Sequence, residues 1–410
     1  MRIKQTLIAA AVLGLLSSGA YAVDFTGYTR VGPGQKQASG DGQRCFNGGG
    51  ADANGSAAPG HGGIGRLGNE CNTYGEFGLV QNATMGGVTY KAELMTNFYS
   101  GGSTPDTTLP GNSLANTPAV SQLYLEGKGY DIAPNVSFWV GRRFYHRADV
   151  HFDDSFYLMG GLGQGATGAG ADGIDTGFGS LGVAVFRFQD STTTTNAGTL
   201  LNFDLQSMPV NPGGQLRLVV SSTKFDGAGG QSGLGLTLQH IQSGLPGGGI
   251  NTLFLQTARG SAGLDMGFGA FNAGSDTKSW RIADSLAWLN GPLTAQTLIH
   301  YGHAQNPTGL GGTFNTKTLS IAGRVAYALT KNFKMQAEVG TANTKVDGKS
   351  SENVTKFTIA PTLTVGPNFY DRPEIRFYVS AFSYNNAYAL ANGQSKTSKT
   401  AAGVQLELWF

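Results

Sequence analysis

The stretch "VQLELWF" at residues 404–410 alternates between two kinds of side chain. Successive side chains of a β-strand point to opposite faces of the sheet. One face would carry only apolar groups, and the other would carry Gln405, Glu407 and Trp409. In a soluble sheet Trp409 would lie among exposed residues, whereas in a transmembrane barrel it would line the lumen and Phe410 would meet lipid.

The same alternation recurs along the chain, in segments of about ten residues that match the length of a transmembrane β-strand. In "VDFTGYTRV" at 23–31, Phe25 falls on one face and Tyr28 and Arg30 on the other. Clusters of Gly, Asn, Asp or Ser separate these segments, and helical periodicity is nearly absent. The pattern predicts one all-β domain, which we interpret as a transmembrane antiparallel β-barrel. A large soluble sandwich is the alternative.

The first 22 residues have the three parts of a secretory signal peptide. Arg2 and Lys4 are basic, an apolar run follows, and "AYA" at 20–22 is a small-x-small cleavage site. We therefore expect a signal peptide over 1–22 and the barrel domain over 23–410. No later stretch is long and apolar enough to form a membrane-spanning helix.

Charge argues against a nucleic-acid partner. Without Arg2 and Lys4 the chain has 26 basic and 26 acidic residues, and nucleic-acid binding favours a basic excess. The chain contains 64 glycines and only 14 prolines, so its loops are expected to be loosened by glycine. We expect no cofactor.

The two cysteines, Cys45 and Cys71, enclose a long glycine-rich segment without periodic hydrophobicity. In an oxidising compartment such a pair predicts one disulfide that closes a loop. Metal binding is the alternative, but no histidines cluster near the pair. We expect no metal site.

Motifs for catalysis are weak. "GQGATG" at 163–168 fits a nucleotide-binding glycine pattern, yet it neither follows a buried strand nor opens a helix. His300 and His303 are three positions apart on an alternating segment, so they face opposite ways. We predict no catalytic residues and no enzymatic activity.

The faces opposite the apolar ones mix aromatic rings with charged groups. Tyr74 and Glu76 share one such face, and Arg376, Tyr378 and Tyr384 share another. A pyranose presents apolar C–H faces that stack on rings, and hydroxyls that need donors and acceptors. The composition of these faces therefore favours a sugar ligand.

Several motifs, taken together, resemble those of the maltoporins, the sugar-specific outer-membrane porins. They include "VDFTGYTR" at 23–30, "WVGRRFYHRADVHFDD" at 139–154, "GIDTGFG" at 173–179, "RPEIRFYV" at 372–379 and the closing "LELWF". The resemblance spans residues 23–410 and is sparse in the loops at 96–117 and 221–250. It implies an outer-membrane barrel of about 18 strands, an inward-folded third loop and a homotrimer embedded in outer-membrane lipid.

The resemblance also implies site residues. The maltoporins conduct sugars along a row of aromatic side chains, the slide, beside a track of charged residues. By position, the slide would comprise Tyr28, Tyr74, Leu253, Tyr384 and Trp409. The track would comprise Arg30, Arg66, Glu76, Arg147, Asp149 and Asp154.

The chain departs from the family pattern at several positions. Phe156 occupies the place of the constriction tyrosine, so the ring is kept and the hydroxyl is lost. Leu253 stands at an aromatic position with Phe254 beside it, and the second loop has no tryptophan.

The resulting function prediction is facilitated diffusion of maltose- or maltodextrin-like oligosaccharides. A general porin or a porin for another sugar is the alternative, and a barrel enzyme or an adhesin belongs to a different class. Without the resemblance, the tyrosines could equally form an interface girdle. The charged residues Arg147, Asp149 and Asp154 could merely pin a loop to the wall.

Overall fold

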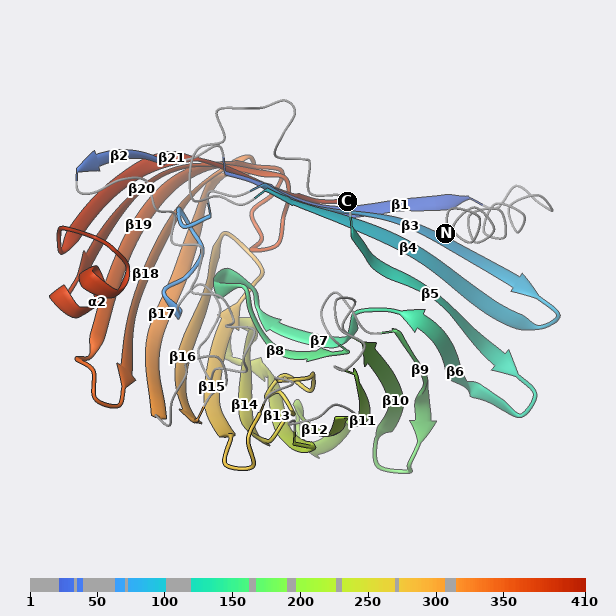
Figure 1. Cartoon of the computed structure of the whole chain (residues 1–410). Coiled ribbons are helices and arrows are strands. Elements are labelled where there is room, and N and C mark those ends of the chain that lie inside the picture. Colours follow the sequence, from blue (N-terminus) through green and yellow to red (C-terminus); the bar gives the residue numbers. More distant parts are fainter. Residues whose placement is uncertain are drawn as a thin grey trace, which may run out of the picture.

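A computed structural model describes residues 22–32, 35–39, 63–70, 73–100, 119–161, 167–189, 197–225, 231–269, 273–306 and 315–410 (Figure 1). The signal peptide expected over 1–22 falls almost wholly outside these residues, as do Cys45 and Cys71. Within the described part, no helix combines the length and the apolar character that a membrane crossing needs.

The strands of the main sheet follow one another in chain order. They are β1 (Val23–Val31), β2 (Gln35–Ser39), β3 (Thr73–Met85), β4 (Val88–Ser100), β5 (Ala119–Tyr130), β6 (Ala133–Arg142), β9 (Thr167–Asp175), β10 (Ser180–Gln189), β11 (Ala197–Asn211), β12 (Gly214–Phe225), β13 (Gly233–Leu245), β14 (Gly249–Arg259), β15 (Lys278–Trp288), β16 (Leu293–Gln305), β17 (Asn315–Thr330), β18 (Phe333–Val346), β19 (Glu352–Thr364), β20 (Glu374–Tyr384) and β21 (Ser398–Trp409). The remaining elements are β7 (Tyr145–Val150), the 3-10 helices η2 (His151–Asp153) and η3 (Pro246–Gly248), β8 (Ser155–Gly160) and α2 (Asn386–Ala391).

The sheet closes on itself as an antiparallel barrel. Apart from β2, each strand of the main sheet pairs with the strands before and after it, and β1 pairs with both β3 and β21. The described sheet has 19 strands, but β1 and β2 both pair with β21 and share one position in the wall. The barrel thus has 18 strand positions, as the resemblance implied.

Side-chain parity agrees with the alternation in the sequence. Along β20, buried and exposed residues alternate from Glu374 to Tyr384. Arg376 is 1% exposed, whereas its neighbour Phe377 is 46% exposed. Outward positions on most strands carry large apolar residues, as expected for a lipid-facing surface. The prediction of a transmembrane barrel over a soluble sandwich is confirmed in its closed topology.

The first and last strands meet at a seam. The geometry of this seam shows which way Trp409 and Phe410 point. Phe410 and Gly27 exchange two backbone hydrogen bonds, with N–O distances of 2.9 and 3.1 Å. The Phe410 ring lies outward, 5.0 Å between centroids from Phe25 and 6.5 Å from Phe77. Trp409 lies on the opposite face, beside its register partner Tyr28.

The two ends of the barrel differ in their connections. One end has tight turns such as Gly86–Gly87, where positive φ values of 58° and 82° suit glycine in a two-residue hairpin. The other end has the long connections, such as those between β2 and β3, between β4 and β5 and between β14 and β15. Short turns face the periplasm and long loops face the exterior in outer-membrane barrels, which orients the chain.

Between β6 and β9, strands β7 and β8 pair only with each other and form a separate hairpin (Figure 1). Inward-facing residues of distant strands contact it. The amide of Phe152 donates to Gln296 Oε1 at 3.2 Å, and Arg324 Nη2 donates to the Phe152 carbonyl at 3.3 Å. The ring of Tyr157 stacks on Phe254 with centroids 4.7 Å apart. The hairpin is therefore tied to β14, β16 and β17.

The seam yields a first prediction. Phe410→Ala removes the ring that covers Phe25 and Phe77, and aromatic pairs contribute about 1 kcal/mol each beyond burial. We expect a lower midpoint of unfolding in urea and a lower yield of assembled barrel from refolding into lipid vesicles. Phe410→Trp keeps an aromatic ring and serves as the control. Equal midpoints and yields for Phe410→Ala and the parent chain would contradict this role of the seam.

Candidate functional site

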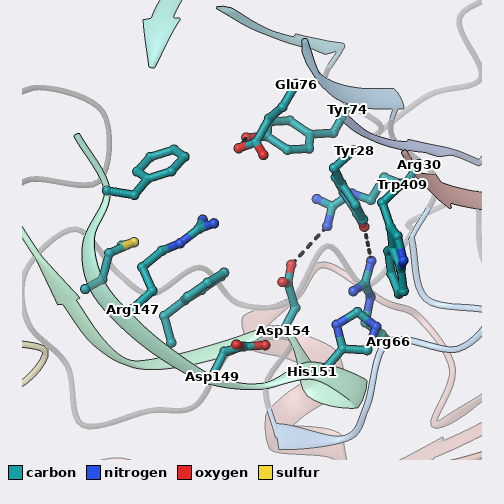
Figure 2. Close-up of a pocket in the computed structure, with 13 residues that line it drawn as sticks. Tyr28, Arg30, Arg66, Tyr74, Glu76, Arg147, Asp149, His151, Asp154 and Trp409 are labelled. Atoms are coloured by element: carbon teal, nitrogen blue, oxygen red, sulfur yellow. Dashed lines mark hydrogen bonds and ion pairs between the residues drawn. The ribbon is translucent and has the colours of Figure 1, made fainter. Parts of the chain in front are cut away.

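A cavity of about 490 Å³ lies beside the seam on the inner face of the barrel (Figure 2). It is lined by Tyr28, Arg30, Arg66, Tyr74, Glu76, Phe144, Arg147, Asp149, His151, Asp154, Phe156, Met159 and Trp409. Ten of the residues singled out in the sequence meet here. They come from β1, β3, β21, the segment 63–70 and the β7–β8 hairpin, so the site forms only when the barrel closes and the hairpin docks.

Three aromatic side chains line the cavity from adjacent strands. Tyr74 on β3, Tyr28 on β1 and Trp409 on β21 follow one another around the wall. The Tyr28 centroid lies 6.1 Å from that of Tyr74 and 6.4 Å from that of Trp409, the latter pair being nearly parallel at 20°. The rings form a continuous row because all three residues have inward parity on neighbouring strands.

An arginine–carboxylate network lies behind and beside this row. Arg30 Nη1 contacts Glu70 Oε1 at 2.8 Å and Asp154 Oδ2 at 2.9 Å, which links β1 to the hairpin. Arg66 contacts the same Glu70 oxygen at 2.9 Å and Glu407 Oε1 at 2.9 Å. Burial alone would lower the pKa of Arg66, but Glu407 and Glu70 raise it well above its ordinary value.

Glu407 lies at the centre of the network and is 1% exposed. Its carboxylate accepts hydrogen bonds from Tyr28 Oη at 3.0 Å and from Arg372 Nε at 2.8 Å. Arg376 Nη2 also donates to it. A single carboxylate on the last strand therefore holds donors from β1, the segment 63–70 and the start of β20.

Trp409 is fixed by its neighbours. The guanidinium carbon of Arg372 lies 4.4 Å from the ring centroid, so a cation covers one face of the indole. His151 meets the indole edge-on, at 5.6 Å and 82°. Burial lowers the pKa of His151 to about 3, so its imidazole is neutral at pH 7. Its 3.8 Å approach to Glu407 is consequently not an ion pair.

The hairpin presents two charged side chains to the cavity. Both Arg147 and Asp149 are exposed to it, and the Arg147 guanidinium stacks on Phe144 at 4.2 Å and on Phe156 at 5.6 Å. The surrounding protein withdraws the Asp149 carboxyl from water and so raises its pKa, and the nearby carboxylate of Asp154 raises that pKa further. Among the described residues, Arg147 makes no ion pair, so its donors are open to the cavity.

Two of the expected slide residues lie elsewhere. Tyr384 has inward parity, but it is 5% exposed and packs in a cluster with Ile64, Val354 and Tyr388 near α2. Leu253 shares the outward parity of Leu255, whereas Phe254 points inward and stacks on Tyr157. A shift of one residue changes the face of a strand side chain, which explains the placement of Leu253.

Sequence reasoning missed Tyr370, which lies just before β20. Its ring is 40% exposed and lies 6.2 Å from Trp409 and 5.3 Å from His151. It therefore continues the aromatic row past Trp409. The stretch "NFYDRPEIR" at 368–376 could have indicated it, because two aromatic residues there come shortly before Arg372, whose guanidinium covers Trp409.

No cluster of three or more His, Cys, Asp or Glu able to hold a metal ion occurs in the described ranges. Glu70, Asp154 and Glu407 instead pair with arginines. What the arrangement offers is a row of ring faces bordered by donors and acceptors.

Comparison with known proteins gives a family. The model described as LamB porin matches residues 23–410. Among solved structures, OccD3 (OpdP) of Pseudomonas aeruginosa aligns at 12% identity and a TM-score of 0.49, covering 95% of this chain and 91% of that one. OccAB2 of Acinetobacter baumannii aligns at 11% identity and a TM-score of 0.48, covering 96% and 100%. These two structures are too distant to inform the site.

The Glu407 network yields a second prediction. Removing one partner of a buried ion pair costs about 3–5 kcal/mol, because the other charges remain buried and unpaired. Glu407→Ala should therefore lower the free energy of unfolding by about 3 kcal/mol in urea titrations. Glu76→Ala is the control. Glu76 accepts a hydrogen bond from the Tyr74 hydroxyl at 2.5 Å and, among the described residues, forms no ion pair. Equal, small losses for both variants would show that Glu407 does not hold the seam.

Proposed function

Because the chain belongs to the LamB porin family, the maltoporins, we propose that it conducts maltose- and maltodextrin-like oligosaccharides by facilitated diffusion. The family makes it a porin channel of the bacterial outer membrane rather than an enzyme. The observation that supports a sugar substrate is the row of Tyr74, Tyr28 and Trp409 within one charged cavity, which Tyr370 continues beyond Trp409.

In this proposal the rings form the slide. A pyranose stacks its C–H face on an aromatic ring, and a row of rings lets it move in short steps without losing contact. Arg372 already covers one face of Trp409, which leaves the other face for a sugar. The substrates are neutral, so stacking rather than net charge selects them.

The charged residues form the track. Arg147 supplies donors and Asp149 supplies acceptors to sugar hydroxyls, and both are exposed to the cavity. Arg30, Arg66, Glu76 and Asp154 border the same space. Hydrogen bonds to ionised groups are stronger than neutral ones, and a track on both sides of the slide provides replacements as each bond breaks.

We further propose that the β7–β8 hairpin is the inward-folded third loop and that it narrows the pore. Its contacts with Gln296, Arg324 and Arg30 support this role, because they hold it against two separate parts of the inner face, the register pair Gln296–Arg324 and β1. Phe156 then forms part of the constriction through its ring alone. Without a phenolic hydroxyl it offers no hydrogen bond there.

Affinity in such a channel is weak by necessity. A site that conducts must release its substrate as readily as it takes it up. The homotrimer, the removal of 1–22 and the Cys45–Cys71 disulfide remain predictions from the sequence. A general porin is the second candidate, since the barrel by itself suits any small solute.

Sugar titration against ion current tests the function. In a planar bilayer, Trp409→Ala should weaken the block by maltodextrin several-fold, because stacking contributes about 1 kcal/mol. Ion conductance should stay similar or rise slightly. Trp280→Ala removes an outward-facing tryptophan and is the matched control. A parent channel without saturable sugar block would favour the general porin.

A second pair of variants tests which tyrosine belongs to the slide. Tyr370→Ala should weaken maltodextrin binding several-fold, since its exposed ring continues the row. Tyr384→Ala should leave the binding constant unchanged and lower the unfolding midpoint instead, because that ring is packed in a buried cluster. The reverse outcome would restore Tyr384 to the slide and remove Tyr370.

A further inference from the structure

The outward face of the barrel carries a basic rim at the end with the long loops. It consists of Arg259 on β14, Lys278 on β15, His303 on β16, Lys317 on β17 and Lys345 on β18. Each lies within two residues of the end of its strand. All have the parity of exposed apolar neighbours such as Leu255, Ile282 and Leu319, and all but the half-buried His303 are exposed.

The basic side chains of the rim lie opposite one another across the sheet. Arg259 is the register partner of Lys278, and Lys317 is the register partner of both His303 and Lys345. Like charges directly opposite on neighbouring strands destabilise a sheet. An arrangement that repeats such pairs implies an anion that compensates them.

Carboxylates of the described residues do not supply that anion. None forms an ion pair with Arg259, Lys278, Lys317 or Lys345 within the ranges that the structure covers. Asp276 and Asp347 lie in the adjoining loops, but they accept hydrogen bonds from Asn306 and Asn315. Within the described residues, the protein therefore does not compensate the charge of the rim.

The aromatic and apolar residues next to the basic rim indicate where an anion that compensates its charge would lie. Trp280 pairs with His303 and contacts Tyr301, so aromatic rings adjoin the basic rim as they do at membrane interfaces. Toward the barrel middle, Ile282, Ile299 and Ile321 form an exposed apolar surface. The rim thus lies where lipid headgroups of the outer leaflet begin.

The basic rim does not continue onto β19, β20 and β21. An outward register row near the long-loop ends of these strands reads Thr355, Ser383 and Ser398. Small uncharged residues suit close contact with protein better than contact with charged headgroups. The rim therefore ends at β18 on this side of the wall (Figure 1). On the other side, Arg187 on β10 and Lys224 on β12 are further exposed cations within two residues of the long-loop ends of their strands.

We propose that the basic rim binds the phosphate groups of a phosphorylated glycolipid in the outer leaflet. Phosphate oxygens accept charge-assisted hydrogen bonds from Arg and Lys, while the acyl chains lie on the apolar surface below. The site is independent of the sugar cavity, because its residues face away from the lumen.

The test uses the full-length assembled protein in a neutral detergent and measures binding by native mass spectrometry. The probes are a bis-phosphorylated glycolipid, its dephosphorylated counterpart and inorganic phosphate. Lys278→Gln with Lys317→Gln should weaken binding of the phosphorylated lipid about ten-fold or more. The matched control is Lys128→Gln with Lys331→Gln, which removes two exposed lysines at the short-turn end.

Three results would overturn the proposal. They are equal binding of the dephosphorylated lipid, an equal loss in the control variant, and binding of inorganic phosphate as tight as that of the lipid. If the rim variant does not assemble, the parent protein still gives an answer. Raising the salt from 0.1 to 1 M should weaken its lipid binding, since exposed charges are screened. Lipid binding that does not change with salt concentration would also contradict the proposed role of the basic rim.

Discussion

The structure depends on one constraint: every backbone N–H and C=O group inside the membrane needs a hydrogen-bond partner. Lipid offers no partner for an N–H or C=O group, so a sheet that spans a bilayer must close without an edge. The pairing of β1 with β3 on one side and β21 on the other meets this requirement. Closure also turns every strand into a wall with one face to lipid and one to the lumen, and the alternation of side chains follows from that.

The seam that closes the barrel is also where the site lies. Tyr28 and Trp409 come from opposite ends of the chain, and only the register between β1 and β21 places them side by side. Glu407 stabilises the same junction, because its carboxylate binds Tyr28, Arg66 and Arg372 from three different segments. Stability of the closed barrel and geometry of the cavity thus share residues, so a change that loosens the seam would also disturb the row of aromatic rings.

The two faces of the wall use charge in different ways. On the inner face, arginines and carboxylates neutralise one another in short contacts, and the few groups left open, such as Arg147 and Asp149, point into the cavity. On the outer face, cations oppose cations at one end of β14–β18 and have no described carboxylate partner. The inner pattern suits neutral hydroxylated solutes, and the outer pattern suits an anionic surface.

Alternation with period two was readable in the sequence, because the direction of a strand side chain depends only on its position in the strand. The inward parity of Tyr28, Tyr74, Glu407 and Trp409 and the outward position of Phe410 followed from it. Parity could not predict how far along the barrel axis each side chain lies, or how tightly it is packed there. Tyr384 had the right face but packs against α2, whereas Tyr370, in a turn without periodicity, reaches Trp409. Those outcomes depend on strand register and on where loops return to the wall, and both are set by contacts between residues far apart in the chain.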